Sequence, residues 1–274
     1  MNKLRRWKVY YPFAENELKS NLAYKGSFYL FVLCSVFGAF ISYYLWMAIY
    51  GSSATGVLGG LTKNEMVTYI FMTYITGGVV NIGISNQITY DVQDGSVVMN
   101  LIKPIDYRLS LIARAMGTAI YRFMLPGIWV WLGLEIYRCV VLKEQITPIV
   151  NILVYLISIL FSFLLYVLYN FCFGMIAFTN TYMFGVKRIE EAIFMFLSGQ
   201  LIPISFFPHV IQTIFEYLPF SSMIYTPVMI YMGKYSVEQT IFAVCRQLVW
   251  LVILYLLGSF LWKKITKRLI VLGG

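Results

Sequence analysis

Charged residues are scarce in this chain, and their scarcity argues against an ordinary soluble fold. Only 12% of the 274 residues are Asp, Glu, Lys or Arg, whereas 60% are hydrophobic. Soluble domains carry about 25% charged residues, because a core of this size still needs a polar surface around it. The composition therefore predicts a membrane protein.

Histidine and cysteine are also rare, which argues against several kinds of site. The single histidine, His209, has no histidine or cysteine cluster beside it, so no metal centre is expected. The four cysteines are far apart and form no CxxC pair, and we interpret them as small apolar residues. No G-x-x-x-x-G-K-[ST] motif occurs, so this chain is not expected to bind ATP phosphates or to be an enzyme.

The hydrophobic residues are gathered into runs long enough to cross a bilayer, which takes about 20 residues. We expect six transmembrane helices in an all-α polytopic fold. They are residues 28–50, 66–89, 111–134, a span within 149–178, a shorter helix from about 186 to 201, and 238–262. The alternative is a seventh, proline-kinked span after Leu201, which would place the two termini on opposite sides.

The net charge of +9 would suit nucleic acid, but the positions of the charges favour a membrane orientation. With a cytoplasmic N-terminus, the inner segments hold fifteen Lys and Arg and the outer loops hold four. Basic residues collect on the cytoplasmic side of membrane proteins. The ratio predicts that both termini are cytoplasmic and that nucleic acid is not a partner. The four outer residues are Lys63, Arg138, Lys143 and Lys234.

Residues 1–26 interleave basic with aromatic residues. This pattern favours an amphipathic helix lying on the cytoplasmic membrane interface, where bases meet lipid headgroups. A disordered basic tail is the alternative. The remaining residues, 27–274, form the predicted membrane domain.

A short polar connection, residues 90–110, separates the second and third spans. Asp94-Gly95 predicts a turn, Ser96 can cap a helix, and Pro104 should end that helix near Lys103. The result is a helix of barely two turns with apolar and charged residues side by side. Such an element suits docking of a soluble partner, and an ordinary loop in the headgroup layer is an equally good interpretation.

Residues 199–235 are apolar but broken by glycine and proline, including Gly199, Pro203 and Pro208. Proline cannot continue a helix regularly, and irregular backbone at membrane depth needs protein or water to satisfy its polar groups. We expect a re-entrant helical hairpin on the outer side, between spans five and six.

The second span holds the best candidate for a transport path. At helical spacing, Thr73, Asn81 and Ser85 share an arc with small residues, which suits a translocation path or close helix packing. Arg122 lies about 12 Å deeper than Arg114 and either faces a partner or snorkels. Glu190 and Glu191 follow Lys187 and Arg188, and we interpret these four as a solvated cluster.

In the two stretches just described, residues 90–110 and 199–235, the chain resembles the ABC-2 type permeases, the membrane subunits of ABC exporters. It is most similar to six-span permeases of multidrug, viologen and antibiotic resistance exporters. The residues that carry the resemblance are DGSVVMNLIKPIDYRL after span two and SGQLIPISFFPHVIQTIFEYLPFSSMIYTP after span five.

The resemblance implies a partner and two sets of site residues. It implies two copies of a separate ATPase that binds ATP and Mg²⁺, a second identical or homologous permease chain, membrane lipid and a bacterial plasma membrane. The expected ATPase-coupling residues are Asp91, Asp94, Gly95, Leu101 and Pro104. The expected outer gate consists of Gly199, Pro203, Phe206, Phe207 and Pro208.

The resemblance also implies the kind of activity. The chain would export a hydrophobic or amphiphilic compound, such as a drug, antibiotic, peptide or lipid-like molecule. The alternatives are an ion-coupled secondary carrier, which would want acids deep in the spans, and a non-transporting immunity or anchor protein. A neighbouring gene for an ATPase would favour the first of the three.

Overall fold

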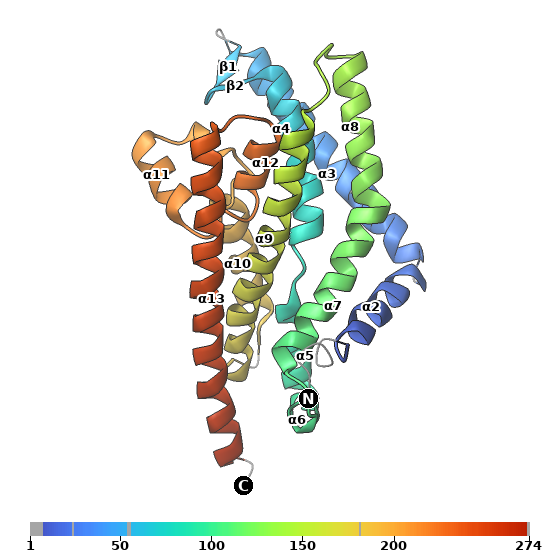
Figure 1. Ribbon diagram of the computed structural model, residues 1–274, viewed down its shortest axis with the longest axis vertical. Helices are drawn as coiled ribbons and strands as arrows, with labels where there is room; N and C mark the ends of the chain where they lie inside the picture. The colour runs from blue at the N-terminus through green and yellow to red at the C-terminus, as the bar shows by residue number, and fades with distance from the viewer. Residues whose placement is uncertain (1–7, 24, 54–55, 181, 273–274) are drawn as a thin grey trace.

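The protein is a helical bundle with one small β-hairpin (Figure 1). The computed structural model describes residues 8–23, 25–53, 56–180 and 182–272. The longer elements are α2 (Tyr11–Ala23), α3 (Lys25–Gly51), α4 (Lys63–Val80), α5 (Ile84–Gln93), α7 (Tyr107–Arg122), α8 (Ile128–Val140), α9 (Ile149–Gly174), α10 (Phe184–Leu197), α11 (His209–Tyr217) and α13 (Val237–Leu272). The shorter ones are β1 (Val57–Leu58), β2 (Leu61–Thr62), α6 (Ser96–Ile102), η1 (Phe123–Gly127), η2 (Met175–Phe178), η3 (Ile204–Phe206) and α12 (Tyr225–Tyr231).

Five helical segments among the described residues are long and apolar enough to cross a membrane. They are Val32–Gly51, Lys63–Gln93, Tyr107–Val140, Ile149–Phe178 and Val237–Lys267, which match five of the six expected spans. The remaining one corresponds to α10, which has 14 residues. At 1.5 Å per residue it is about 21 Å long, shorter than the roughly 30 Å hydrocarbon layer. The six-span count therefore stays a prediction.

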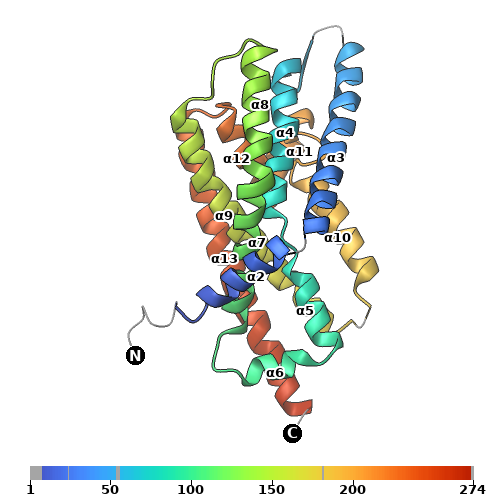
Figure 2. The ribbon, with the colours of Figure 1, turned by 90° about the vertical axis from the view of Figure 1, so that its right-hand side faces the viewer.

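The bundle has two distinct ends. α6 and the C-terminal part of α13 lie at one end, and the β1–β2 hairpin and the α8–α9 connection lie at the other (Figures 1 and 2). We call these the α6 end and the β-hairpin end. The long helices run between them, so any signal from one end to the other has to pass along a helix.

The centre of the bundle is α4, which contacts α3, α8, α9 and α12. Two of its buried threonines keep hydrogen-bond partners. Thr73 donates to the carbonyl of Tyr69 (2.6 Å), and the hydroxyl of Thr76 is hydrogen-bonded to the hydroxyl of Tyr155 (3.0 Å). A polar side chain that finds such a partner can lie inside a helix bundle at little cost. The polar side of α4 therefore faces other helices of the same chain.

The second expected span is not one continuous helix. α4 ends at Val80 and α5 begins at Ile84, and Asn81 and Gly83 have non-helical backbone angles (ψ 68° and 79°). Glycine loses entropy in a helix, and the side chain of Asn competes for backbone hydrogen bonds. The expectation that Thr73 and Ser85 share one helix face assumes a continuous helix. It is wrong, because the two residues belong to different helices.

The third expected span contains a wide turn where the proline falls. Between α7 and α8 the chain forms the π-helical segment η1, which contains Pro126. Proline has no N–H and its ring clashes with the carbonyl four residues earlier, here that of Arg122. The wide turn relieves this clash, because the N–H of Ile128 donates to the carbonyl of Phe123 five residues back. The span continues in spite of Pro126.

The described part of the N-terminal region contains a helix, as expected. α2 crosses α7 near the α6 end (Figure 2) and has no buried residue. The two backbones come very close, because a Cβ placed on Gly117 would lie 2.2 Å from the carbonyl oxygen of Ala14. Residues 1–7 and 24 of the predicted interface helix lie outside the described residues.

Residues 199–235 fold as two short helices joined by irregular backbone. α12 is buried along its whole length, and α11, which has no buried residue, lies on the outside of the bundle (Figure 1). Gln247 of α13 satisfies the irregular backbone before α12, because its amide donates to the carbonyl of Ser222 (2.8 Å) and to Ser162 (3.1 Å). This arrangement keeps the segment at depth without unpaired carbonyls at that point.

Candidate functional site

A buried carboxylate organises the connection between α5 and α7. Asp91, on the last turns of α5, is only 4% exposed. Its oxygens accept hydrogen bonds from Gln87 (2.7 Å), Ser96 (3.3 Å), Asn100 (3.3 Å) and Tyr107 (2.6 Å). Hydrogen bonds to a charged acceptor are the stronger kind, and here they reach three helices. Asp91 therefore fixes α6 in place and is not itself exposed to a partner.

The turn before α6 is built as the sequence suggests, with one correction. Gly95 adopts a left-handed conformation (φ 77°), which glycine accepts readily. Ser96 is the first residue of α6 and not its cap; its hydroxyl donates to Asp91 instead. The N–H of Ser96 donates to the carboxylate of Asp94 (2.9 Å), and this bond holds the pKa of Asp94 below its ordinary value.

The end of α6 follows the expectation for proline. Lys103 has extended backbone angles (φ −63°, ψ 140°), as a residue before proline should, and α6 stops at Ile102. Asp106 then caps α7 by accepting from the N–H of Leu109 (3.1 Å). The corner from α5 to α7 is therefore closed by local hydrogen bonds at both turns.

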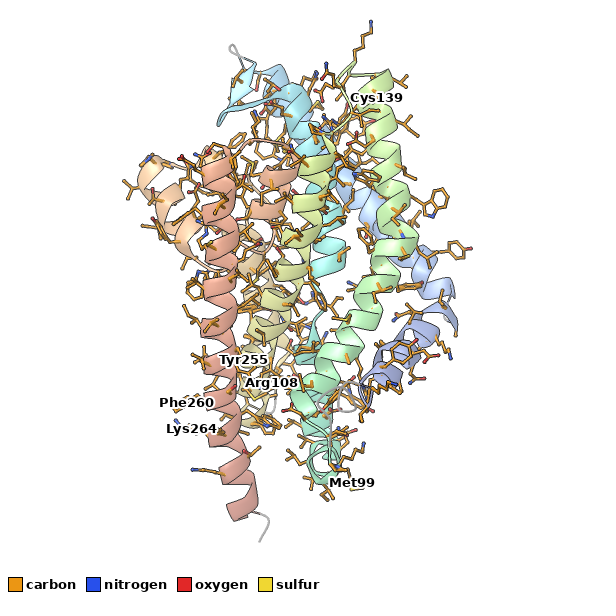
Figure 3. The ribbon with its side chains drawn as sticks, in the orientation of Figure 1. Met99, Arg108, Cys139, Tyr255, Phe260 and Lys264 are labelled. Atoms are coloured by element: carbon orange, nitrogen blue, oxygen red, sulfur yellow. The ribbon has the colours of Figure 1, made fainter. Side chains whose placement is uncertain are left out.

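The outer face of α6 is apolar and exposed. Met99 is 63% exposed and Ile102 is 73% exposed, and Val98 and Leu101 are also exposed, whereas Val97 turns inward and is buried. Met99 lies at the tip of this end in Figure 3. A short helix that is hydrogen-bonded to the bundle on one face and apolar on its exposed face is suited to docking a partner. Of the predicted coupling residues, Leu101, Asp94, Gly95 and Pro104 are exposed, and Asp91 supports them from beneath.

The same corner is tied to α13. The ring of Tyr107 stacks on Trp262 at a centroid distance of 5.3 Å. Arg108 donates to the hydroxyl of Ser259 (2.7 Å), and its guanidinium lies 4.3 Å from the ring centroid of Tyr255 (Figure 3). Through these contacts, the long C-terminal helix α13 also supports the turn that carries α6.

The break between α4 and α5 is the second polar site, and Arg122 caps it. Its guanidinium donates to the carbonyls of Gly78 (3.2 Å) and Asn81 (3.3 Å), which the broken helix leaves without helical partners. Asn170 of α9 accepts from the N–H of Ser85 on the other side of the break (3.0 Å). Arg122 thus has a partner inside the bundle, one of the two interpretations left open by the sequence.

The break also contacts the start of the irregular segment. The amide of Asn81 donates to the side chain of Gln200 (3.2 Å), which follows Gly199 at the end of α10. A Cβ placed on Gly77 would lie 3.1 Å from the same Gln200 amide. Sequence reasoning missed Gln200 and the break, although the run of Gly77, Gly78, Asn81 and Gly83 is a usable signal. Of the predicted path residues, Asn81 and Ser85 lie at the break, and Thr73 is a buried residue of α4.

The aromatic residues predicted for an outer gate pack against other residues of the same chain. Phe206 lies against Trp46 of α3 (centroid distance 5.0 Å) and touches Gly59 of the β-hairpin. Phe207 packs against Phe196 of α10 and Phe215 of α11 (5.3 Å and 5.2 Å). Both lie toward the β-hairpin end, so they hold α10, α11 and the hairpin together there.

Gly199, Pro203 and Pro208 shape this segment as expected from their chemistry. Gly199 has φ 78°, and its carbonyl accepts from the hydroxyl of Tyr69. A Cβ there would also lie 3.2 Å from Ile204 and Tyr225. Pro203 and Pro208 directly precede η3 and α11, where a missing N–H is not needed. The gating role of these residues stays a prediction.

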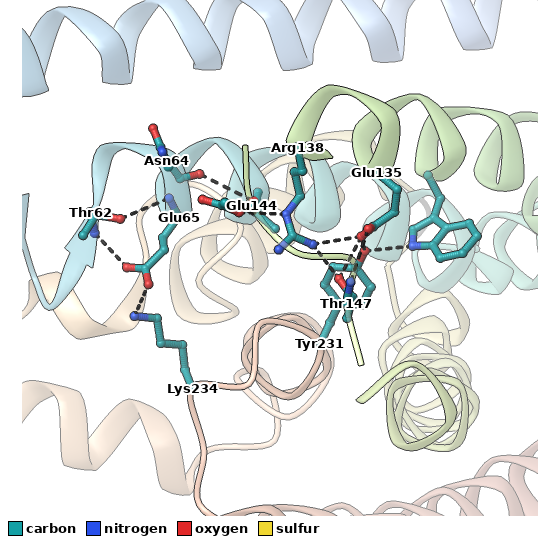
Figure 4. Close-up of polar contacts among 11 residues, drawn as sticks. Thr62, Asn64, Glu65, Glu135, Arg138, Glu144, Thr147, Tyr231 and Lys234 are labelled. Carbon is teal, nitrogen blue, oxygen red and sulfur yellow. Dashed lines mark hydrogen bonds and ion pairs between the residues drawn. The ribbon is translucent and has the colours of Figure 1, made fainter. Parts of the chain in front are cut away.

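Besides Asp91, two further acidic residues are buried among the described residues. Glu190 is 6% exposed, so the interpretation of a solvated cluster is wrong for it, whereas Glu191 pairs with Arg188 (2.8 Å) as that interpretation requires. Glu135 of α8 is buried beside Arg138 (2.9 Å), Thr147 and Tyr231 (Figure 4). The Glu135 carboxylate therefore joins α8, the start of α9 and α12 at the β-hairpin end.

A small apolar cavity of ≈ 60 Å³ lies between α3, α4 and η1, next to Arg122. Its lining is mostly apolar and aromatic, and includes Phe71, Tyr74 and Pro126. Among the described residues, no group of three or more His, Cys, Asp and Glu could hold a metal ion.

Comparison with known families agrees with this architecture. No curated protein matches the chain. A profile described as ABC-2 family transporter protein matches residues 26–272, which is nearly all of the sequence. Permeases of this family are membrane subunits that generally work with ABC ATPase partners. This chain, with its clamped α6 and its spanning helices, belongs to the ABC-2 transporter family as a multi-pass membrane permease.

Proposed function

We propose that this permease exports a hydrophobic or amphiphilic compound with energy from ATP hydrolysed on a separate ATPase. The observation that carries the proposal is the exposed apolar face of α6, held by the buried Asp91. A docking element has to be rigid if a movement of the partner is to be transmitted and not absorbed. ATP and Mg²⁺ then belong to the partner, in two copies per transporter.

The route of the movement would run through the broken helix. α6 is held to α5 by Asp91, and α5 begins at the break that Arg122 caps. A short break between two helices is a natural hinge, because few backbone angles need to change. The bond between Asn81 and Gln200 continues the route to the segment before α11. This chain of contacts supports a coupling path from the α6 end to the β-hairpin end.

Six crossings and cytoplasmic termini fit the arrangement best. α10 would enter from the α6 end, and residues 199–235 would complete the crossing as a re-entrant hairpin on the outer side. The α6 end would then face the cytoplasm, in agreement with the fifteen to four division of basic residues. A bacterial plasma membrane is the setting that the family resemblance suggests.

A second permease chain would complete the pore. α3 and α10 lie on the same side of the bundle, on the right in Figure 2. Both helices expose large apolar residues, including Phe37 and Ile41 of α3 and Ile193 of α10. A second copy or a homologous chain would cover part of this face and enclose the path between the two protomers. Phe206 and Phe207 would gate its outer opening.

The nature of the cargo is inferred from the lining of the bundle. The cavity beside Arg122 is apolar, and a wider pocket of ≈ 440 Å³ between α3 and α8 is lined by Phe40, Tyr43 and Tyr44. Aromatic and aliphatic linings suit hydrophobic or amphiphilic molecules such as drugs, antibiotics, peptides or lipid-like compounds.

The docking part of the proposal can be tested with charged substitutions on α6. Met99→Asp and Ile102→Asp place a charge on an exposed apolar surface, so folding should be unaffected. In the complex that charge would be buried without a partner, and co-purification of the ATPase should fall by about tenfold or more. Val57→Asp, exposed at the β-hairpin end, is the matched control. Normal assembly and ATP-dependent export by both α6 variants would contradict the proposal.

One observation favours a second candidate, a proton-coupled carrier. Glu190 is a buried acid on α10, and one of its oxygens has no hydrogen-bond partner among the described residues. Buried acids in membrane helices often serve proton transfer. Export from vesicles that depends on a proton gradient, persists without ATP and is abolished by Glu190→Gln would establish this alternative. Export that needs ATP and ignores an uncoupler would exclude it.

A further inference from the structure

A further pocket, lined by both charged and apolar residues, lies near the α6 end between α2, α5 and α7. It has a volume of ≈ 170 Å³, and its lining includes Glu17, Asn86, Arg114 and Thr118. Part of its wall is the α4–α5 break itself, from Ile82 to Ile84. A water molecule occupies about 30 Å³ in the liquid, so the pocket has room for a small group of about six water volumes.

The approach of α2 to α7 places two opposite charges on this pocket. Ala14 contacts Gly117, and the amide of Asn21 donates to Thr118 (3.3 Å). Glu17 is three residues after Ala14 and four before Asn21, so it lies on the same face of α2. Arg114 is three residues before Gly117 and lies on the face of α7 that meets α2. Helical spacing therefore explains why both side chains line the pocket.

Neither charge is neutralised by the other. In the part of the chain that the structure describes, Glu17 and Arg114 form no ion pair. The guanidinium of Arg114 lies 5.6 Å from the ring centroid of Phe13. Both residues also line a wider and more open pocket formed by α2 and Arg114 of α7. They therefore stand at the opening between the surface and the pocket.

The pocket has charged groups of both signs around it. The guanidinium of Arg114 lines the pocket and favours an anion. The Lys187 ammonium lies nearby, bonded to Asn86. Glu17, on α2, is the carboxylate on the opposite wall. A ligand that carries an anionic group and a cationic group a short distance apart could pair with Arg114 and Glu17 at once.

We infer that this pocket binds the phosphate–ammonium headgroup of a membrane lipid, of the phosphatidylethanolamine class. Arg114 takes the phosphate, and Glu17 takes the primary ammonium. α2 crosses α7 at this level, and Arg114 lies seven residues into α7, about 10 Å from its first residue.

A lipid bound here would have a consequence for the break. It would contact the backbone of Ile82 to Ile84, and so it would stabilise one arrangement of the hinge between α4 and α5. This inference concerns a site separate from the ATPase contact and from the cargo. It therefore stands or falls without the proposed export function.

The test compares lipids that differ only in the headgroup. The permease is purified in detergent, and binding of phosphatidylethanolamine, phosphatidylcholine and phosphatidylglycerol with identical acyl chains is measured by native mass spectrometry. Phosphatidylethanolamine should bind about tenfold more tightly than the other two, because only its headgroup carries an N–H ammonium for Glu17. Soluble phosphoethanolamine is included, because a free phosphate compound shares the same chemistry.

Two variants separate the roles of the charges. Glu17→Gln should bring phosphatidylethanolamine down to the level of phosphatidylcholine while phosphate lipids still bind. Arg114→Gln should weaken all three lipids, and Arg114→Lys should restore part of the binding. Arg188→Gln and Glu238→Gln remove exposed charges elsewhere and should bind as the unaltered protein does. If Arg114→Gln does not fold, Glu17→Gln alone decides the question.

Three outcomes would overturn the inference. Equal binding of the three lipids to the unaltered protein would indicate annular lipid only. A preference for phosphatidylethanolamine that survives Glu17→Gln would place its ammonium elsewhere. Binding of soluble phosphoethanolamine as tight as that of the lipid would identify a water-soluble ligand and not a membrane lipid.

Discussion

The hydroxyl of Tyr107 donates a 2.6 Å hydrogen bond to the carboxylate of Asp91 across the turn that carries α6. The ring of Tyr107 is stacked at the same time on Trp262 of α13. One side chain therefore joins the end of α5, the start of α7 and the C-terminal helix. Because α6 lies between the two bonded residues, its position depends on this pair.

Loss of that bond should loosen α6 without unfolding the bundle. Tyr107→Phe keeps the ring against Trp262 but removes a hydrogen bond to a charged group, which contributes about 1.5–3 kcal/mol. Amide protons of α6 should then exchange about tenfold to a hundredfold faster in hydrogen-exchange mass spectrometry. Tyr90→Phe, exposed on the same helix as Asp91, is the control and should change nothing. Unchanged exchange in Tyr107→Phe would show that α6 is held by other contacts.

Arg122 should be a stability residue as well as a candidate for coupling. Arg122→Gln leaves the carbonyls of Gly78 and Asn81 without their donor, and each unsatisfied buried group costs about 1–3 kcal/mol. Arg122→Lys keeps a positive donor but not the planar fork, so the thermal stability in detergent should fall in the order Arg, Lys, Gln. Arg188→Gln is an exposed control, with an expected change within about 0.5 kcal/mol. A fully stable Arg122→Gln would mean that water or another side chain caps the break.

The β-hairpin offers a matched pair of glycines for testing its contact with the aromatic cluster. Gly59 and Gly60 form the two-residue turn between β1 and β2 and both have positive φ (55° and 75°). A Cβ on Gly59 would lie 2.5 Å from the ring of Phe206, whereas one on Gly60 would meet nothing within 4 Å. Gly59→Ala should therefore cost about 1–3 kcal/mol more than Gly60→Ala in thermal unfolding. Equal costs would show that Phe206 moves aside freely.

The predicted topology can be tested by labelling single cysteines in a background with the four native cysteines replaced. An impermeant thiol reagent should label Gln145→Cys on intact cells but should not label Lys103→Cys or Lys264→Cys until the membrane is opened. The reason is that Gln145 lies at the β-hairpin end and the other two lie at the α6 end. Labelling of Lys264→Cys from outside would contradict the cytoplasmic placement of the C-terminal end of α13.

Sequence reasoning worked where a feature depends on local chemistry. The five long spans follow from hydrophobic length, and the boundaries of α6 follow from Gly95 and Pro104, because each residue fixes its own backbone angles. The family was also identified from its two motif-bearing stretches. In these cases, neighbours in the chain decide the structure.

Features that depend on contacts between distant residues were missed. The break at Asn81 persists because Arg122 and Gln200, 41 and 119 residues away, satisfy it. Asp91 reads as a surface acid in the sequence and is buried because Tyr107 and Asn100 fold back onto it. The burial of Glu190 likewise depends on how α10 packs. Such partners could not be assigned from helical spacing alone.

The contact between Gln247 and Ser222 has a consequence for biogenesis. A chain emerging from the ribosome makes α9 and α12 before α13, and the carbonyl of Ser222 accepts from Ser162 of α9 (3.0 Å) and from the Gln247 amide of α13 (2.8 Å). Until the last helix is inserted, the second of these two hydrogen bonds has to come from water or from the insertion machinery, because hydrocarbon offers no donor. α12 should therefore enter its place between α4 and α9 as a late step, after synthesis of the final span. A nascent chain stalled before Gln247 would keep residues 218–231 open to protease, and release of the full chain would close them.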